Sequence, residues 1–126
     1  MQQNKWQKDY YMGQMMNTKK LTEINILGTI YKISYYDNST DVDIHKREPH
    51  WGQIDYWTRT IRLYKNDFPD SEIFKTLFHE MLHGIMEHGQ MQEINTEKNV
   101  ELLTNLIVDT LLRNNLITIK EGVYEN

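Results

Sequence analysis

The feature that most constrains this chain is an H-E-x-x-H sequence at residues 79–83, His79-Glu80-Met81-Leu82-His83. Histidines four residues apart lie one turn from each other on the same face of an α-helix, so both imidazoles can bind one metal ion. The glutamate is about 100° from the first histidine and about 60° from the second, close enough to reach a metal-bound water without being a ligand. The sequence therefore predicts a helix that carries two metal ligands and a base, the arrangement found in zinc hydrolases.

The residues around this motif have the pattern of an amphipathic helix. At about 100° per residue from His79, the apolar side chains occupy an arc from roughly 200° to 300° and the polar ones an arc from roughly 0° to 100°. The apolar set is Phe74, Phe78, Met81, Leu82 and Ile85, and the polar set is Glu72, Thr76, His79, Glu80, His83 and Glu87. The histidines are thus separate from the apolar face. The alternative is a coincidental pair on a solvated face, which about one or two such chains in a hundred would have.

Local signals set the limits of this helix. Asp70 or Ser71 can cap its first turn, and Gly89 after His88 suits a C-terminal cap. Gly84 falls on the apolar side, where a glycine predicts the close approach of another backbone.

Composition limits the classes of protein that this chain can belong to. The 126 residues are 39% hydrophobic and 25% charged, which is typical of one globular domain, expected over residues 21–126 after a polar tail or short helix over 1–20. The net charge of -4 and the lack of a basic cluster argue against nucleic acid as a partner. No apolar run suits a membrane or a signal peptide, so a cytoplasmic protein is expected. Without cysteine, any metal must be bound by His, Asp or Glu.

The remaining pattern predicts an α+β fold with a small antiparallel sheet of about three strands. Near-alternation of β-branched, aliphatic and aromatic residues from 24 to 36 indicates one long strand with a bulge at Gly28. Residues 38–51 form a polar loop, and residues 52–57 and 60–64 are predicted to be two strands around a short turn. A short strand is expected at Ile117 and Ile119, after which the chain frays.

Asn95 or Thr96 is expected to cap a second helix that continues to about Asn114, and this helix supplies the candidates for a third ligand. Its apolar stripe is Val100, Leu103, Ile107 and Leu111. Glu97 lies roughly 90° from the centre of that stripe and Glu101 roughly 130°, so Glu97 is nearer the face that meets the first helix. We therefore predict Glu97 as the third ligand, with Glu101 as the alternative or as a partner of a ligand histidine. Glu87 and Glu93 also follow the motif, and His45 and His50 lie in the polar loop.

Taken together, these segments resemble the small zincin-like metallopeptidases of phages and prophages, distant relatives of the ImmA/IrrE group. The resemblance rests on the H-E-x-x-H helix, on residues 52–56 and 60–63, on a strand similar to residues 26–31, and on a second helix of the form Glu-x-x-Val-x-x-Leu-x-x-x-Ile-x-x-x-Leu-x-x-Asn from Glu97 to Asn114. It covers roughly residues 24–115. It implies a minimal zincin-like domain and places the family's glutamate ligand on Glu97.

The activity expected from this resemblance is zinc-dependent hydrolysis of a protein or peptide, with Zn²⁺ on His79, His83 and Glu97 and with Glu80 as general base. Candidates for stabilising the oxyanion are Tyr56, Tyr64, His50 and Arg59, and the edge of strand 60–64 is expected to bind the substrate in extended form. One alternative is a binding module with a structural zinc whose fourth position is blocked by His50 or Glu87. Another is an interaction protein of phage origin with a vestigial motif.

Overall fold

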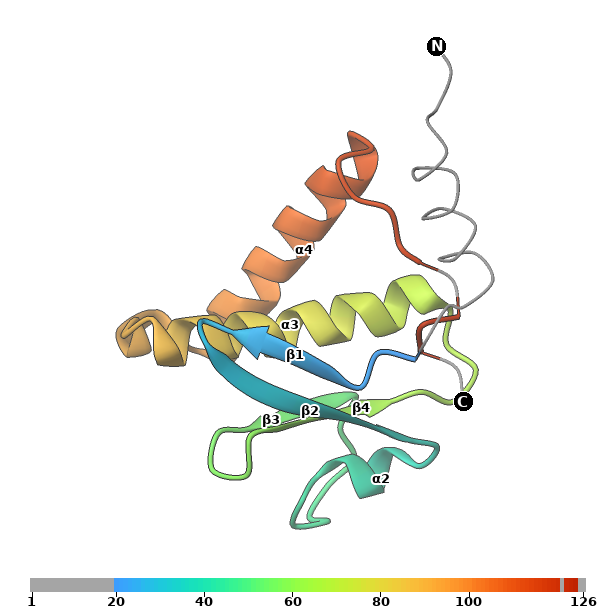
Figure 1. The fold of residues 1–126 in the computed structure, drawn as a ribbon, viewed down its shortest axis with the longest axis vertical. Helices are drawn as coiled ribbons and strands as arrows, with labels where there is room; N and C mark the ends of the chain where they lie inside the picture. Colours follow the sequence, from blue (N-terminus) through green and yellow to red (C-terminus); the bar gives the residue numbers. More distant parts are fainter. Residues whose placement is uncertain (1–19, 121, 125–126) are drawn as a thin grey trace, which may run out of the picture.

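The computed structural model describes residues 20–120 and 122–124 (Figure 1). The tail or short helix expected over residues 1–20 lies outside the described residues, except for its last residue. Within the described residues, the elements in chain order are β1 (Glu23–Ile26), β2 (Thr29–Tyr36), α2 (Ser39–Val42), β3 (Gly52–Asp55), β4 (Thr60–Tyr64), α3 (Asp70–His88), the 3₁₀ turn η1 (Gln92–Ile94) and α4 (Glu97–Arg113). The α+β class predicted from the sequence is confirmed.

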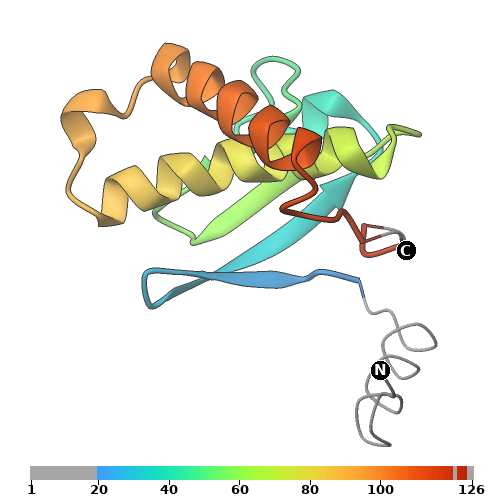
Figure 2. The same ribbon diagram turned by 90° about the horizontal axis from the view of Figure 1, so that it is seen from above.

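The strands form one mixed sheet of four strands in the order β1-β2-β4-β3. The outer pairs, β1 with β2 and β3 with β4, are antiparallel, and the central pair of β2 and β4 is parallel. The expected antiparallel sheet of about three strands is therefore wrong in strand number and in the direction of its central pair. α3 packs against the sheet, and α4 crosses α3 (Figure 2).

The extra strand comes from a hairpin within residues 23–36, where one long bulged strand was expected. Leu27 and Gly28 have φ angles of 50° and 92°, and a left-handed pair of this kind makes a two-residue turn between antiparallel strands. The Asn25 side chain supports the turn by accepting a hydrogen bond from the Gly28 N–H at 2.7 Å. β1 thus folds back on β2 and becomes one edge of the sheet.

The two long helices agree closely with the sequence prediction. The Thr96 side chain caps α4 and accepts a hydrogen bond from the Asn99 N–H, as expected. At the start of α3 no side chain caps the helix, and Asp70 instead accepts a hydrogen bond from the Gly122 N–H, so the expected Asp70 or Ser71 cap is wrong. Four residues of the expected loop, Ser39–Val42, form the short helix α2.

The core lies between the sheet and α3. Its fully or almost fully buried members are Ile26, Tyr31, Ile33, Ile61, Leu63, Ile73, Leu77 and Tyr124. Gly84 fits here because a Cβ atom would lie 2.8 Å from Ile26 Cδ1 and 3.0 Å from Ile54 Cδ1, so side chains rather than the predicted backbone fill this space.

The C-terminal segment also departs from the expectation. No strand forms at Ile117 and Ile119. Among the described residues after them, Tyr124 is only 3% exposed within the core and Val123 accepts a hydrogen bond from the Leu21 N–H, so residues 122–124 are held to the fold where fraying was expected. In the part of the chain that the structure describes, no helix is both long enough and apolar enough to span a membrane.

Candidate metal centre

α3 presents the two motif histidines side by side. His79 and His83 are one turn apart, and their ring centroids are separated by 4.9 Å. The side chains are 18% and 10% exposed, so both rings are largely withdrawn from water while remaining at the surface of a cleft. Burial lowers the pKa of His79 and outweighs the opposing effect of the nearby Glu97 carboxylate. Because only a neutral imidazole binds a metal ion, this shift favours the ligand form.

The third member of the cluster is Glu97, the first residue of α4. One of its carboxylate oxygens is 2.8 Å from His83 Nε2 and the other is 3.2 Å from His79 Nε2. One ligand atom from each of the three residues lies within 4.8 Å of the others, so the cluster could hold a metal ion. Glu97, which the sequence prediction preferred over Glu101, is the carboxylate that α4 brings to the histidines. Glu101 lines the same cleft but does not join the cluster.

Asn95, in the connection between η1 and α4, fixes the orientation of His83. Its side-chain oxygen is 2.6 Å from His83 Nδ1, and its amide nitrogen donates to Tyr56 Oη and to the His83 carbonyl. The amide nitrogen must donate, so the oxygen faces the ring and Nδ1 carries the proton. Nε2 of a neutral His83 then presents a lone pair to the Glu97 oxygen at 2.8 Å. Two acceptors at this distance require a proton or a cation between them, which fits a metal-binding role.

Glu80 is buried beside the cluster, with 6% of its surface exposed. Burial raises its pKa to about 8, the Glu97 carboxylate adds to the rise, and a hydrogen bond from the Ile54 backbone opposes it. Gly52 at the start of β3 makes room for this side chain, since a Cβ atom there would lie 3.0 Å from Glu80 Oε2 and 2.6 Å from Thr76 Cγ2. A bound cation would lower the pKa of Glu80 again, because it stabilises the carboxylate.

A cleft of about 870 Å³ opens over the cluster. It is bounded by α3, by α4 and by the stretch that leads into and through β3. The lining residues from α3 are Glu72, Lys75, Thr76, His79, Glu80 and His83, and those from α4 are Glu97, Glu101, Thr104 and Asn105. The remaining lining residues are Arg47, Glu48, His50, Trp51, Gly52, Gln53, Ile54 and Tyr56. Some of the other residues that the sequence suggested as oxyanion donors or metal ligands line this cleft, and others do not. Tyr56 and His50 line the cleft, whereas Tyr64, Arg59, Glu87, Glu93 and His45 are not among its lining residues.

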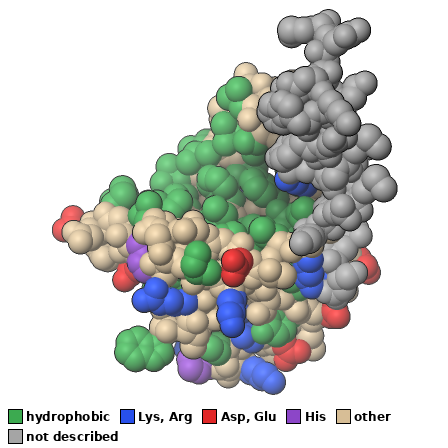
Figure 3. All heavy atoms as spheres, in the orientation of Figure 1, with side chains coloured by type: hydrophobic (Ala, Val, Ile, Leu, Met, Phe, Trp, Pro, Cys, Tyr) green, Lys and Arg blue, Asp and Glu red, His purple; other side chains and the backbone are tan. Residues whose placement is uncertain are grey.

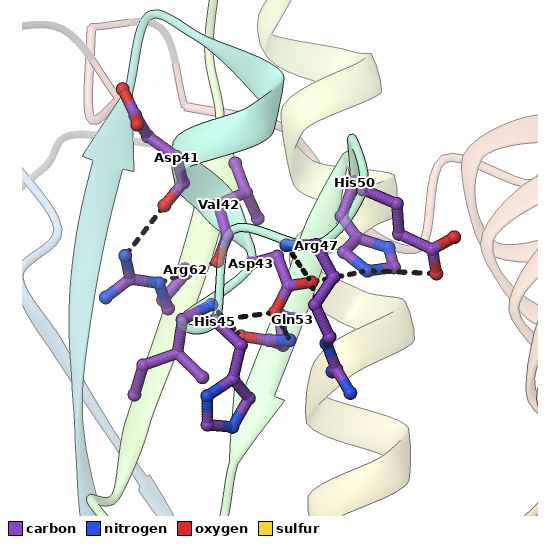
Figure 4. A network of polar contacts seen from close by, with 10 residues as sticks. Asp41, Val42, Asp43, His45, Arg47, His50, Gln53 and Arg62 are labelled. Atoms are coloured by element: carbon purple, nitrogen blue, oxygen red, sulfur yellow. Dashed lines mark hydrogen bonds and ion pairs between the residues drawn. The ribbon is translucent and has the colours of Figure 1, made fainter.

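The wall opposite α4 is held by a buried carboxylate, Asp43 (Figure 4). Its side chain accepts hydrogen bonds from the His45 and Arg47 N–H groups, from Arg47 Nε and from Gln53 Nε2, and His50 Nε2 lies 3.7 Å away. The His45 N–H contributes most to holding the pKa of Asp43 well below its usual range, against the opposing effect of burial. Arg47 and His50 therefore line the cleft from a segment that these contacts hold together.

Sequence reasoning missed Asn95 as a partner of His83 and Gly52 as the neighbour of Glu80. Asn95 was considered only as a helix cap, and its place just before the first ligand of α4 was the one local signal for another role. Gly52 carries no such signal, because its contact with α3 joins residues far apart in the chain.

Comparison with known proteins does not assign the chain to a family, since no family model, curated protein or solved structure matches it.

Proposed function

We propose that the protein is a zinc-dependent peptidase that uses Glu80 as its general base. The observation that carries this proposal is the convergence of His79, His83 and Glu97 at the mouth of a cleft, with Glu80 buried beside them. Two imidazoles and one carboxylate are a common ligand set of catalytic zinc, which keeps its fourth position for water or substrate. Of the described residues, neither His50 nor Glu87 belongs to the cluster, which favours an open fourth position over a structural site.

A zinc ion bound by these residues would lower the pKa of a coordinated water and polarise the substrate carbonyl. Glu80 would accept a proton from a water at the site as the carbonyl is attacked, and would then pass a proton to the leaving amine. Its position one residue after His79, with Gly52 behind it, keeps the carboxylate next to the cluster rather than in it. Of the residues predicted to stabilise the oxyanion, Tyr56 and His50 line the cleft. The Tyr56 hydroxyl donates a hydrogen bond to the His83 carbonyl at 3.2 Å, so it would have to release this bond in order to donate to an oxyanion.

We further propose that an extended peptide binds along β3. The expected strand, residues 60–64, cannot do this because β4 is paired on both sides. β3 is an edge of the sheet and lines the cleft. Because the Tyr64 N–H donates to the Trp51 carbonyl, alternation directs the backbone groups of Gly52 and Ile54 away from β4. One of these groups, the Ile54 N–H, contacts Glu80, so the free edge lies next to the proposed base.

The phage or prophage origin, the kinship with the ImmA/IrrE group, a regulatory protein as substrate and a cytoplasmic location remain proposals. They rest on the sequence resemblance described above.

Two measurements on three proteins test the proposed function. Zinc content is measured by elemental analysis, and hydrolysis is measured on denatured casein and on a pool of internally quenched peptides, for the wild type, His83→Ala and Glu80→Gln. We expect about one zinc per chain in the wild type and in Glu80→Gln, and none in His83→Ala. Hydrolysis should fall about 10²- to 10⁴-fold in Glu80→Gln. Zinc without hydrolysis in the wild type would instead support the binding module, and no zinc after loading would support a vestigial motif.

A further inference from the structure

The outer face of α4 exposes large apolar side chains that the rest of the described structure leaves uncovered. Leu102 and Leu106, one turn apart, are 55% and 56% exposed. α4 rests on α3 through Val100, Thr104 and Val108, the residues of this helix that are buried. In Figure 3 hydrophobic side chains gather in one patch over α4 and the adjoining part of α3. Helices with apolar residues beyond their packed stripe usually bury that second surface against another molecule.

The apolar surface of α4 is continuous on the side away from the cleft. On a helical wheel Leu106 lies about 180° from the ligand Glu97, with Leu102 roughly 40° to one side of it and Leu103 roughly 60° to the other. Leu103 and Ile107 are half-buried and connect this arc to α3. A partner bound here would therefore leave the candidate metal centre open.

The charges beside this arc are arranged for a second copy of the same helix. Lys98 and Asp109 lie on one flank of the arc, about 20° apart around the helix axis and three turns apart along it. The midpoint between them is within one residue of the midpoint between Leu102 and Leu106. In an antiparallel pair of helices related by a two-fold axis, residues on the same flank meet across the interface. A single two-fold axis would therefore pair both the leucines and the opposite charges of the two helices.

We propose that the chain forms a homodimer in which α4 packs antiparallel against α4 of a second copy. Leu102 contacts the partner's Leu106, and Lys98 pairs with the partner's Asp109, each contact occurring twice. Asp109 also bonds Arg113 Nε at 2.8 Å in its own helix, and it is 61% exposed, so its carboxylate is accessible to both cations. The match of opposite charges about the same axis as the apolar contacts favours this occupant over an unrelated protein.

The expected dimer is weak, because one pair of helices buries an area at the low end of specific interfaces. Dissociation on dilution is therefore part of the proposal. The test is sedimentation equilibrium of the full chain over a dilution series from about 1 mM to about 1 μM, a range that spans weak protein–protein affinities. We expect the mass to rise with concentration from 15.2 kDa towards twice that value. A wild type that stays monomeric throughout overturns the proposal.

Two variants locate the interface. Leu106→Lys is expected to remain monomeric over the whole range. Leu116→Lys is its matched control, because Leu116 is 68% exposed but lies beyond α4, and it should dimerise like the wild type. Circular dichroism verifies that both variants are folded. A dimer that persists in Leu106→Lys, or that is lost equally in Leu116→Lys, places the contact elsewhere and refutes the α4 interface.

A charge exchange tests the antiparallel register. Lys98→Glu and Asp109→Lys each place like charges opposite one another, so each should weaken dimerisation at low salt. The double variant Lys98→Glu/Asp109→Lys restores opposite charges and should recover dimerisation to within about threefold of the wild type. If the double variant is as weak as the stronger of the two single defects, Lys98 does not face the partner's Asp109 and the proposed register is wrong.

Discussion

At the scale of single residues, Gly52 shows how a residue without a functional group can control the proposed base. The space that a Cβ atom would need is occupied by Thr76 Cγ2 at 2.6 Å and Glu80 Oε2 at 3.0 Å. Gly52→Ala must therefore displace one of these side chains. We expect zinc content to be unchanged and peptide hydrolysis to fall roughly 10- to 100-fold, because a misplacement of about 1 Å costs rates of this order.

The same geometry supplies a compensating control. Thr76→Ser removes the methyl group that is nearest to the new Cβ atom, so hydrolysis by Gly52→Ala/Thr76→Ser should exceed that of Gly52→Ala. Steady-state rates of the two variants on the same quenched peptide measure this difference. Full hydrolysis by Gly52→Ala alone would show that the position of Glu80 does not depend on this contact.

Asn95 belongs to the same scale, because its contact with His83 Nδ1 orients a candidate metal ligand. Asn95→Ala removes the acceptor that holds the Nδ1 proton, which leaves the ring free to rotate. Loss of such a partner typically weakens metal binding about 10- to 100-fold. Competition with a chromophoric chelator measures the zinc affinity, with Gln92→Ala as control since Gln92 Nε2 donates to the Glu87 carbonyl in the same connection. Equal affinities in the two variants would contradict a role for Asn95 in orienting His83.

At the scale of elements, the segment between α2 and β3 is held together by polar contacts rather than by a regular ladder. Asp43 is fully buried at its centre, and Arg62 on β4 donates to the carbonyls of Val42 and Asp41 (Figure 4). Because Arg47 and His50 reach the cleft from this segment, the shape of one cleft wall depends on a single ionised carboxylate.

The depressed pKa of Asp43 predicts how stability depends on pH. A carboxyl group whose pKa is lower in the folded than in the unfolded chain stabilises the fold fully above its unfolded pKa of about 3.9. That contribution is lost as the pH falls from there towards the folded pKa. We expect Asp43→Asn to unfold at a lower urea concentration than the wild type at pH 7. The difference between the two urea midpoints should become smaller below about pH 4. Urea titrations at both pH values, with the exposed Asp67→Asn as control, test this, and a gap that widens on acidification would contradict it.

The elements that sequence patterns predicted well are those governed by local chemistry. The helical period of α3 and the Thr96 cap both depend on residues that are close together in the sequence. The helical wheel was likewise sufficient to prefer Glu97 over Glu101 as the third member of the cluster. The turn at Leu27 and Gly28 was misread because a strand with a bulge and a tight hairpin have the same alternation on either side of the glycine. The parallel pairing of β2 with β4 has no local signal at all, since it joins residues 28 positions apart, as in Lys32 with Thr60.

The same distinction explains the rest of the candidate site. The candidate ligands His79, His83 and Glu97 follow from helical periodicity, whereas the surroundings of Glu80 are set by contacts across the fold. Burial of Glu80 depends on the approach of β3 through Gly52. The expected strand at Ile117 and Ile119 does not form for a related reason: pairing of a short alternating run with a sheet edge depends on where the fold places that run, and the chain here returns to the core through Tyr124.

At the scale of the whole molecule, the candidate metal centre spans the two long helices, α3 and α4. α3 rests on the sheet, and α4 packs on α3, with Val100, Thr104 and Val108 as its buried residues. Glu97 at the start of α4 meets the α3 histidines within hydrogen-bond distance. A metal ion held by all three residues would therefore tie α4 to α3 and contribute its binding free energy to folding.

This coupling predicts that zinc stabilises the fold against heat. At a free zinc concentration about 100 times the dissociation constant, linkage adds about 2.7 kcal/mol, which for a domain of this size raises Tm by roughly 10 °C. The increase should disappear with a chelator and be absent in His83→Ala.

The increase in Tm with zinc should also become smaller as the pH falls below about 6, because protons compete with the metal for its imidazole ligands. Burial lowers the pKa of His79, which leaves that ring neutral at a more acidic pH than an ordinary histidine and weakens proton competition there. Scanning calorimetry at pH 7.5 and pH 5.5, with and without zinc, measures both effects. An equal increase in His83→Ala would mean that zinc binds elsewhere on the folded chain.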